Sequence, residues 1–173
     1  MHVTARTVDR RPAFVDDADC ERFLRTLSKT VRRSRWRCAA YCLMPNHHHL
    51  VLQLPDEPSL SRGMHLLNGV FARRYNERHG RRGHLFKARF HSTLIESDAH
   101  LLETLRYVVL NPCRARLSRR PEEWPWSSFR ACAGLEPTPP FLDASAVWEL
   151  FADSPGSDAR TRYALFTMER LRG

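Results

Sequence analysis

The sequence has no hydrophobic run approaching the roughly eighteen residues that a membrane-spanning helix requires. Its first residues, 1–6, also lack the apolar core of a secretion signal. We therefore expect no bilayer-spanning segment and a cytoplasmic location. With 173 residues, 42% of them hydrophobic, the chain is long enough to bury the core of one domain.

Cysteine is scarce, and it is not arranged in pairs. The sequence holds five cysteines and no Cys-x-x-Cys motif. An odd number without such a pair argues against a disulfide framework and against an ordinary zinc ribbon. We expect reduced and mostly buried thiols at Cys20, Cys38, Cys42, Cys113 and Cys132.

Negative charge is in short supply. Lysine and arginine number 28 against 19 acidic residues, which gives a net charge of +9, and only Lys29 and Lys87 are lysines. Such an excess favours a polyanionic partner, most simply nucleic acid, and hence a location at the nucleoid. Arginine suits bidentate contacts with phosphate, although a GC-rich genome produces the same preference for arginine over lysine.

Apolar periodicity predicts three long helices and two short ones. The long helices are expected from Asp16 to about Arg35, from a cap at Ser59 to Gly80, and from Ser97 or Asp98 onward. The pair Asn111-Pro112 is expected to end or kink the third helix, because the residue before proline resists the helical conformation. The short helices are expected at 143–151 and 157–171.

Strands are predicted within four ranges, 1–15, 36–44, 47–54 and 84–95. The order strand, helix, strand, strand, helix, strand, helix favours an α+β fold, with helices on one or both faces of a central antiparallel sheet. We assign residues 1–133 to one candidate catalytic domain. Residues 134–173 are expected to form a tail of short helices packed on or near that core.

The sharpest local feature is the run of histidines at 47–49. Alternate residues of a strand share a face, so His47 and His49 can point at one metal ion while His48 points the other way. Two imidazoles do not complete the coordination of a divalent cation. A third ligand must come from another element, and open positions would remain for water and a phosphate oxygen.

Tyr107 stands out among the four tyrosines because it lies off the apolar stripe of its predicted helix. It shares a polar line with His100, Thr104 and Asn111 at helical spacing. A tyrosine four residues before an asparagine can deliver a nucleophile and a neutral oxygen ligand to one place. We therefore take Tyr107 as the candidate nucleophile and Asn111 as the candidate third metal ligand.

Two segments carry a resemblance to a known family. Residues 44–50 read Met-Pro-Asn-His-His-His-Leu, and residues 106–115 read Arg-Tyr-Val-Val-Leu-Asn-Pro-Cys-Arg-Ala. Both closely resemble motifs of the REP-associated tyrosine transposases, which belong to the IS200-like, single-tyrosine branch of the HUH transposases. Further matches at 40–43, 83–90 and 126–128 extend the similarity over most of the chain.

This resemblance implies a ferredoxin-like core, Mg²⁺ or Mn²⁺ as cofactor, and single-stranded, hairpin-forming DNA as substrate. It implies a transposase that nicks and rejoins DNA through a 5′-phosphotyrosine link at Tyr107, acting as a monomer or homodimer. Two positions depart from the family pattern. The middle residue of the triplet is usually apolar but here is His48, and the N-terminal turn reads Arg-Thr-Val-Asp-Arg-Arg at 6–11.

A cluster of basic side chains in the middle of the sequence is the candidate DNA-binding surface. Its members are Arg73, Arg74, Arg78, Arg81, Arg82, Lys87 and Arg89. Three other readings remain open. In these alternatives the chain is a hairpin-binding protein that no longer cuts, a metal hydrolase that uses activated water, or a zinc-structured RNA-binding protein built around Cys38 and Cys42.

Overall fold

A four-stranded antiparallel sheet lies at the centre of the computed structural model, which describes residues 1–87, 89–152 and 158–171. Its strands are β1 (His2–Arg6), β2 (Arg37–Met44), β3 (His47–Gln53) and β4 (His91–Thr93). Their order across the sheet is β2-β3-β1-β4, so the two strands that carry the N-terminal residues and the histidine triplet are central neighbours. This order, with two crossover helices, is the ferredoxin-like arrangement that the family resemblance implied.

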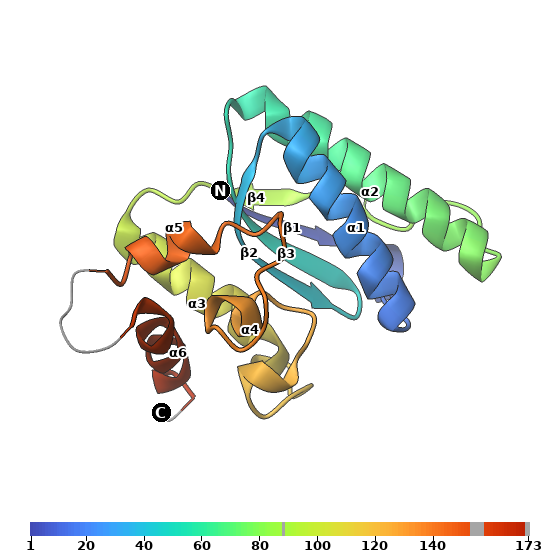
Figure 1. The fold of residues 1–173 in the computed structure, drawn as a ribbon. Coiled ribbons are helices and arrows are strands. Elements are labelled where there is room, and N and C mark those ends of the chain that lie inside the picture. Colours follow the sequence, from blue (N-terminus) through green and yellow to red (C-terminus); the bar gives the residue numbers. More distant parts are fainter. Residues whose placement is uncertain (88, 153–157, 172–173) are drawn as a thin grey trace.

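Helices α1 (Asp17–Ser34) and α2 (Glu57–His79) pack together on one face of the sheet (Figure 1). Each begins at an aspartate that accepts a hydrogen bond from a backbone amide in the first turn, Asp16 for α1 and Asp56 for α2. The predicted cap at Ser59 is therefore wrong. The helix begins earlier because Pro58, which has no N–H to leave unsatisfied, fits its first turn. None of the helices in the described ranges is long and apolar enough to cross a bilayer.

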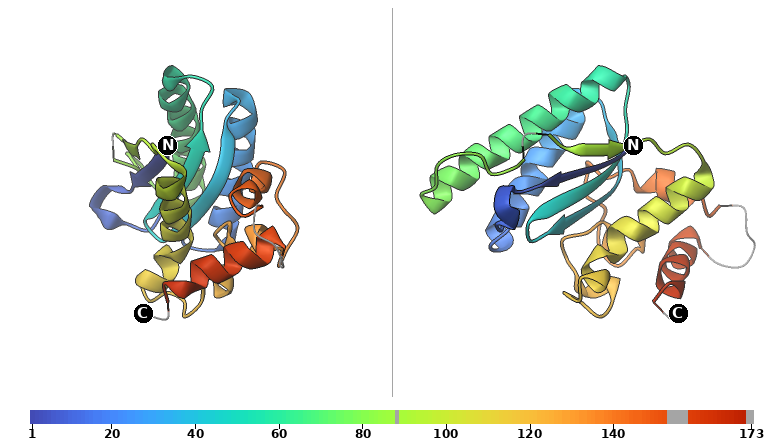
Figure 2. Two further views of the ribbon diagram at one scale, coloured as in Figure 1. Left: turned by 90° about the vertical axis from the view of Figure 1, so that its left-hand side faces the viewer. Right: turned by 180° about the vertical axis from the view of Figure 1, so that it is seen from behind.

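Helix α3 (Asp98–Arg114) lies on the opposite face of the sheet and contacts β2 and β3 (Figure 2). It begins at Ser97, as predicted, but it does not end at Asn111-Pro112. Pro112 cannot donate to the carbonyl of Val108, and the side-chain amide of Asn111 donates to that oxygen instead, at 3.4 Å. The helix therefore continues past the proline to Arg114.

Most of the predicted strand at 84–95 is a loop. Only His91–Thr93 pairs with β1, opposite its residues 2–4. Nearer the end of β1, the amide of Lys87 donates to the Arg6 carbonyl. Within the loop, Phe86 forms an isolated bridge with Thr7, and the carbonyl of Leu85 accepts from the amide of Val8. Leu85 and Phe86 are buried, so their apolar character reflects packing within a loop that makes this isolated bridge at the end of β1.

The C-terminal part of the chain covers the outer edge of β2. The amide of Ser128 donates to the Tyr41 carbonyl, that of Leu43 to Trp126, and that of Asp143 to Cys38. An uncovered edge strand invites pairing with another chain, so this segment protects the sheet. The same region holds α4 (Phe129–Cys132), α5 (Ala144–Glu149) and α6 (Ala159–Glu169).

The two short helices predicted in the tail are confirmed as α5 and α6, apart from residues 153–157 and 172–173, which lie outside the described residues. Val147 and Tyr163 are each 1% exposed and belong to the same buried cluster as the sheet. All five cysteines are free and all but Cys113 are buried, as predicted.

We predict that Gly63→Ala destabilises the protein by about 1–3 kcal/mol, because overpacking a buried contact forces neighbours from their rotamers. A Cβ at this position in α2 would overlap the ring of Trp36, which is only 4% exposed. Gly69→Ala on the same helix is the matched control, since a Cβ there meets nothing within 4 Å. That control should raise the free energy of unfolding by about 0.5–1 kcal/mol. Equal urea midpoints for the two variants would contradict this account of Gly63.

Candidate active site between strand β3 and helix α3

The three consecutive histidines of β3 divide between the two faces of the sheet. His48 points toward the α1–α2 layer, where its ring lies 4.6 Å from that of Phe23 and 5.5 Å from that of Phe86. His47 and His49 lie on the opposite face, with ring centroids 4.9 Å apart. This is the alternation that the sequence predicted, and it leaves His48 outside the candidate metal pair.

His49 is held from β1. Its direct partner in the antiparallel register is Thr4, whose hydroxyl oxygen lies 3.0 Å from Nδ1, and the Nε2 of His2 lies at the same distance. A proton on Nδ1 that is donated to Thr4 leaves the lone pair of Nε2 free. Within the described residues this Nε2 is buried and has no hydrogen-bond partner, which is costly unless a ligand occupies it.

His47 is oriented by its neighbour. The side-chain oxygen of Asn46 accepts from Nδ1 at 2.7 Å, while the Asn46 amide nitrogen donates to the carbonyl of Arg10. A ring nitrogen fixed in this way sets the tautomer and directs the other nitrogen outward, as is usual for metal-binding histidines. Asn46 was not singled out from the sequence as a site residue, although it stands within the matched 44–50 motif.

Both imidazoles are uncharged near neutral pH. Burial lowers the pKa of His47 to about 4, with a further contribution from the positive charge of Arg6. Burial also lowers the pKa of His49 to about 2, and the neighbouring histidines His47 and His2 add to this effect. Neutral imidazole is the form that binds a metal ion, so the site is set for ligation without loss of a proton.

Tyr107 faces His49 across the space between the sheet and α3. The ring centroids of the two residues are 5.8 Å apart, and the ring of His2 is 5.9 Å from that of Tyr107. The Tyr107 side chain remains accessible, since the residue is 39% exposed. The structure therefore brings together the candidate nucleophile and one of the candidate metal ligands, which are far apart in the sequence.

Asn111 lies one turn beyond Tyr107 on α3, and its amide nitrogen donates to the Tyr107 carbonyl at 2.9 Å. Its side-chain oxygen accepts no hydrogen bond from any residue that the structure describes, and neither histidine bonds to it. The proposed third ligand is thus present on the correct helix with its oxygen free. Its role as a ligand stays a prediction.

No group of three or more His, Cys, Asp or Glu side chains within the described ranges is placed to hold a metal ion. Cys38 and Cys42 are buried in β2, and burial raises the pKa of both thiols far above the ordinary value. These observations argue against the zinc-structured alternative. A cation at His47 and His49 would need oxygen ligands from an amide or from a substrate.

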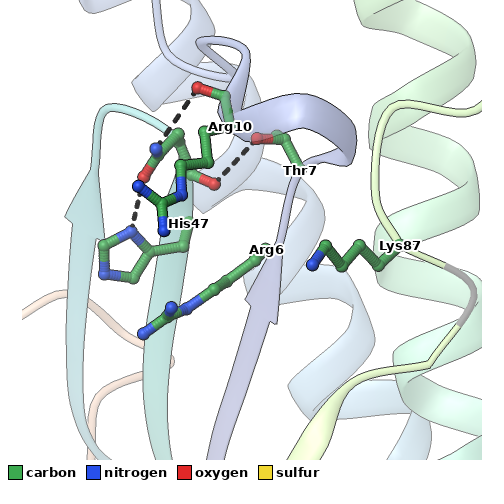
Figure 3. Close-up of a pocket in the computed structure, with 6 residues that line it drawn as sticks. Arg6, Thr7, Arg10, His47 and Lys87 are labelled. Atoms are coloured by element: carbon green, nitrogen blue, oxygen red, sulfur yellow. Dashed lines mark hydrogen bonds between the residues drawn. The ribbon is translucent and has the colours of Figure 1, made fainter.

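A basic hollow of about 280 Å³ opens beside His47 (Figure 3). Arg6 reaches it from the end of β1, Arg10 from the following turn, and Lys87 from the loop after α2. The turn reverses because Asp9 and Arg10 both adopt the left-handed conformation. The hollow therefore concentrates positive charge directly beside the candidate metal pair.

Among the predicted DNA contacts, only Lys87 lines this hollow. Most of the others lie at the surface of α2 or the loop after it, namely Arg73, Arg74, Arg81, Arg82 and Arg89. Sequence reasoning missed Arg6 and Arg10 as candidate contacts. The signal for Arg6 was its place in the alternation of β1, two residues after Thr4 and opposite His47.

Arg78 differs from the other predicted contacts because two carboxylates hold it. Its guanidinium bonds to Asp16 at 2.6 Å and to Asp19 at 2.5 Å, and Asp19 is only 1% exposed. His79 bonds to the same buried carboxylate at 3.0 Å. Arg78 thus joins the end of α2 to the start of α1, and we remove it from the candidate DNA surface.

The comparisons with known proteins agree with this fold and site. Residues 1–111 match the family model described as Transposase IS200 like. The chain therefore belongs to the family of IS200-like transposases, a family of DNA-cleaving enzymes. Within that family it is similar to the REP-associated tyrosine transposases, as the sequence motifs predicted.

One relative is the REP-associated tyrosine transposase of Haemophilus influenzae, which is 27% identical over 131 residues. The alignment covers 70% of this chain and 74% of the relative. A solved structure of a REP-associated tyrosine transposase bound to a REP hairpin matches with a TM-score of 0.66 at 19% identity, covering 79% of this chain and 81% of that one. The similarity to this solved structure confirms the fold. The REP hairpin is the DNA bound to that solved protein.

We predict that His48→Leu raises the free energy of unfolding by about 1–3 kcal/mol, because leaving buried polar atoms unpaired carries a penalty of that size. His48 is 0% exposed, and neither ring nitrogen finds a partner among the described residues. His65→Leu, on the exposed side of α2, is the control and should change stability by less than about 0.5 kcal/mol. A urea titration in which His48→Leu unfolds earlier than the parent protein would contradict this assignment.

Arg78→Ala should lower the midpoint of urea unfolding, because it leaves the buried carboxylate of Asp19 with fewer partners. Arg74→Ala removes a nearby arginine that has no ion pair within the described residues, and it should leave the midpoint unchanged. A stable Arg78→Ala protein with weakened DNA binding would return Arg78 to the DNA surface.

Proposed function

We propose that this protein nicks and rejoins single-stranded, hairpin-forming DNA through a covalent link between Tyr107 and a 5′-phosphate. The observation that carries the proposal is the approach of Tyr107 to His49, with ring centroids 5.8 Å apart, beside a second histidine on the same strand face. A nucleophile next to a pair of neutral imidazoles, one with a buried and unpartnered nitrogen, suits metal-assisted phosphoryl transfer.

The reaction can be written with its atoms in balance. The phenolic oxygen of Tyr107 forms a bond to phosphorus, and the bond between phosphorus and the 3′-oxygen breaks. The tyrosine proton ends, in net terms, on the 3′-oxygen, which leaves as a free hydroxyl. The phosphotyrosine bond retains the energy of the phosphodiester, so a different 3′-hydroxyl can reverse the step and join a new strand.

The residues present fit a divalent cation. His47 and His49 would hold Mg²⁺ or Mn²⁺, with Asn111 as the third ligand. The observation that supports a cation here is the buried Nε2 of His49, which has no hydrogen-bond partner among the described residues. Such an ion, when bound, supplies charge neutralisation at a phosphoryl oxygen. Thr4 and Asn46 orient the two imidazoles, and their hydrogen bonds keep the metal-facing nitrogens available.

The basic hollow formed by Arg6, Arg10 and Lys87 is the proposed seat of the DNA backbone next to the cleaved bond. Arginine and lysine neutralise phosphates without reading sequence, so this surface would position the strand rather than select it. The similar protein that was solved with a REP hairpin supports a hairpin as the substrate class. Exposed arginines on α2 and the following loop would extend the contact.

Tyr107→Phe should abolish the covalent protein–DNA adduct, because it removes only the nucleophilic oxygen. The assay incubates the full chain with single-stranded hairpin DNA and Mn²⁺, followed by denaturing electrophoresis. Tyr75→Phe is the matched control, since its hydroxyl bonds to Pro12 on the α1–α2 side of the sheet, and it should form the adduct normally.

Three outcomes separate the rival activities. Cleavage by Tyr107→Phe without an adduct, and its loss in His49→Ala, would identify a metal hydrolase that uses activated water. Hairpin binding by the wild-type protein with no cleavage under any divalent metal would identify a binding protein. An adduct that requires Tyr107 and both histidines supports the transposase mechanism.

Lys87→Ala should weaken hairpin binding and reduce the slope of log affinity against log salt by about 0.7, the value for one lost phosphate contact on single-stranded DNA. Lys29→Ala removes the only other lysine, which is exposed on α1, and should leave the slope unchanged. Fluorescence anisotropy across a salt series makes the comparison. Identical slopes for the two variants would exclude the hollow as part of the binding surface.

A further inference from the structure

Tyr107 lines a second hollow, of about 750 Å³, which shares no lining residue with the hollow formed by Arg6, Arg10 and Lys87. Its walls come from β1, from α3 and from the end of α6, and they include three arginines, Arg106, Arg114 and Arg170. The candidate nucleophile therefore borders a space large enough for a nucleotide, lined by three arginines and by two glutamates, Glu103 and Glu169.

The three arginines are not equivalent. Arg106 forms an ion pair with Glu103, and its guanidinium lies 4.3 Å from the ring centroid of Phe166 on α6. The hydrogen bond from Arg106 lowers the pKa of Glu103, and the charge of Arg170 adds to this effect. Arg114, unlike Arg106, has no carboxylate within ion-pair distance in the described part of the chain. Its charge is therefore available to a ligand.

Arg114 also lies against the nucleophile. Its guanidinium carbon is 5.1 Å from the centroid of the Tyr107 ring. The contact exists because α3 passes through Pro112, with the Asn111 amide serving the carbonyl of Val108. Residues 107 and 114 then stand roughly two turns apart on one face of a continuous helix.

We propose that Arg114 is a catalytic residue that binds the non-bridging oxygens of the phosphate attacked by Tyr107. This inference rests on the proposed function. A guanidinium pairs with two phosphate oxygens at once, and its attraction strengthens as charge accumulates on them in the transition state. The ring of Tyr107 contacts both His49 and Arg114, so a phosphate reaching its hydroxyl would meet the candidate metal pair and this guanidinium together.

The test is a cycle that combines Arg114→Ala with a neutral methylphosphonate at the cleaved position. That position is first mapped by sequencing the DNA released by the wild-type protein. Hairpin affinity is then measured in EDTA, so the readout does not depend on metal or turnover. The methylphosphonate should weaken wild-type binding about tenfold, the effect of losing one charged hydrogen bond of roughly 1.4 kcal/mol. It should not weaken binding to Arg114→Ala.

A kinetic arm measures single-turnover adduct formation with saturating DNA and Mn²⁺. Arg114→Ala should slow the step by about 10²-fold or more, as loss of a transition-state donor does, and Arg114→Lys should recover part of the rate. Arg119→Ala, an exposed arginine beyond the end of α3, is the control and should behave as wild type.

Equal methylphosphonate penalties in the wild-type and Arg114→Ala proteins, or an unchanged adduct rate, would overturn the role of Arg114 alone. Failure of the wild-type protein to form any adduct would instead overturn the proposed function. Thermal unfolding of each variant identifies a rate loss that comes from misfolding. If Arg114→Ala is misfolded, the adduct rate of Arg114→Lys, which keeps the positive charge, is compared with that of the wild type instead.

Discussion

The register between β1 and β3 is the constraint on which the candidate site depends. Thr4 stands opposite His49 and Arg6 opposite His47, so the anchoring hydroxyl, the basic side chain and both imidazoles share one face. A slip of one residue would exchange the faces of the whole strand and bury the metal pair. Contacts at both ends of the pairing hold it in place, since the Met1 amino group donates to Leu52 and the Thr7 amide to Asn46.

The second constraint is the position of α3, which carries the nucleophile. Arg106 links it to α6 through Phe166, and the short turn at Pro121–Glu123 contacts it as well. The same C-terminal part covers the edge of β2, so the sheet and the helix are braced from one side. This explains why residues remote from the chemistry are buried. They hold the two halves of the site at a fixed separation, which proximity catalysis requires.

Much of this could be read from the sequence, because it depends on short-range periodicity. The alternation of 47–49 predicted the faces of His47, His48 and His49, and the apolar spacing predicted three helices beside an antiparallel sheet. The ferredoxin-like arrangement of the strands followed only from the family resemblance. The rest depends on partners that lie far away in the chain. No local pattern shows that the Asn111 amide donates to the carbonyl that Pro112 leaves without a donor. Nor does any local pattern show that Leu85 and Phe86 are buried in a loop rather than in a strand. The contact of His2 with His49 was likewise invisible.

The roles of the arginines depend most strongly on partners that lie far away in the chain. Composition indicates a polyanionic partner but cannot distinguish a structural arginine from a free one. Arg78, in the predicted basic cluster, is held by Asp16 and Asp19, whereas Arg6 and Arg114 contact no carboxylate among the described residues and flank the candidate histidines and tyrosine. Charges already paired inside the fold cannot bind a phosphate without losing that pairing, so binding must rely on the unpaired ones. The positive surface available to a phosphate is therefore smaller than the count of 28 basic residues suggests, and Arg6 and Arg114 place part of it where the chemistry is proposed to occur.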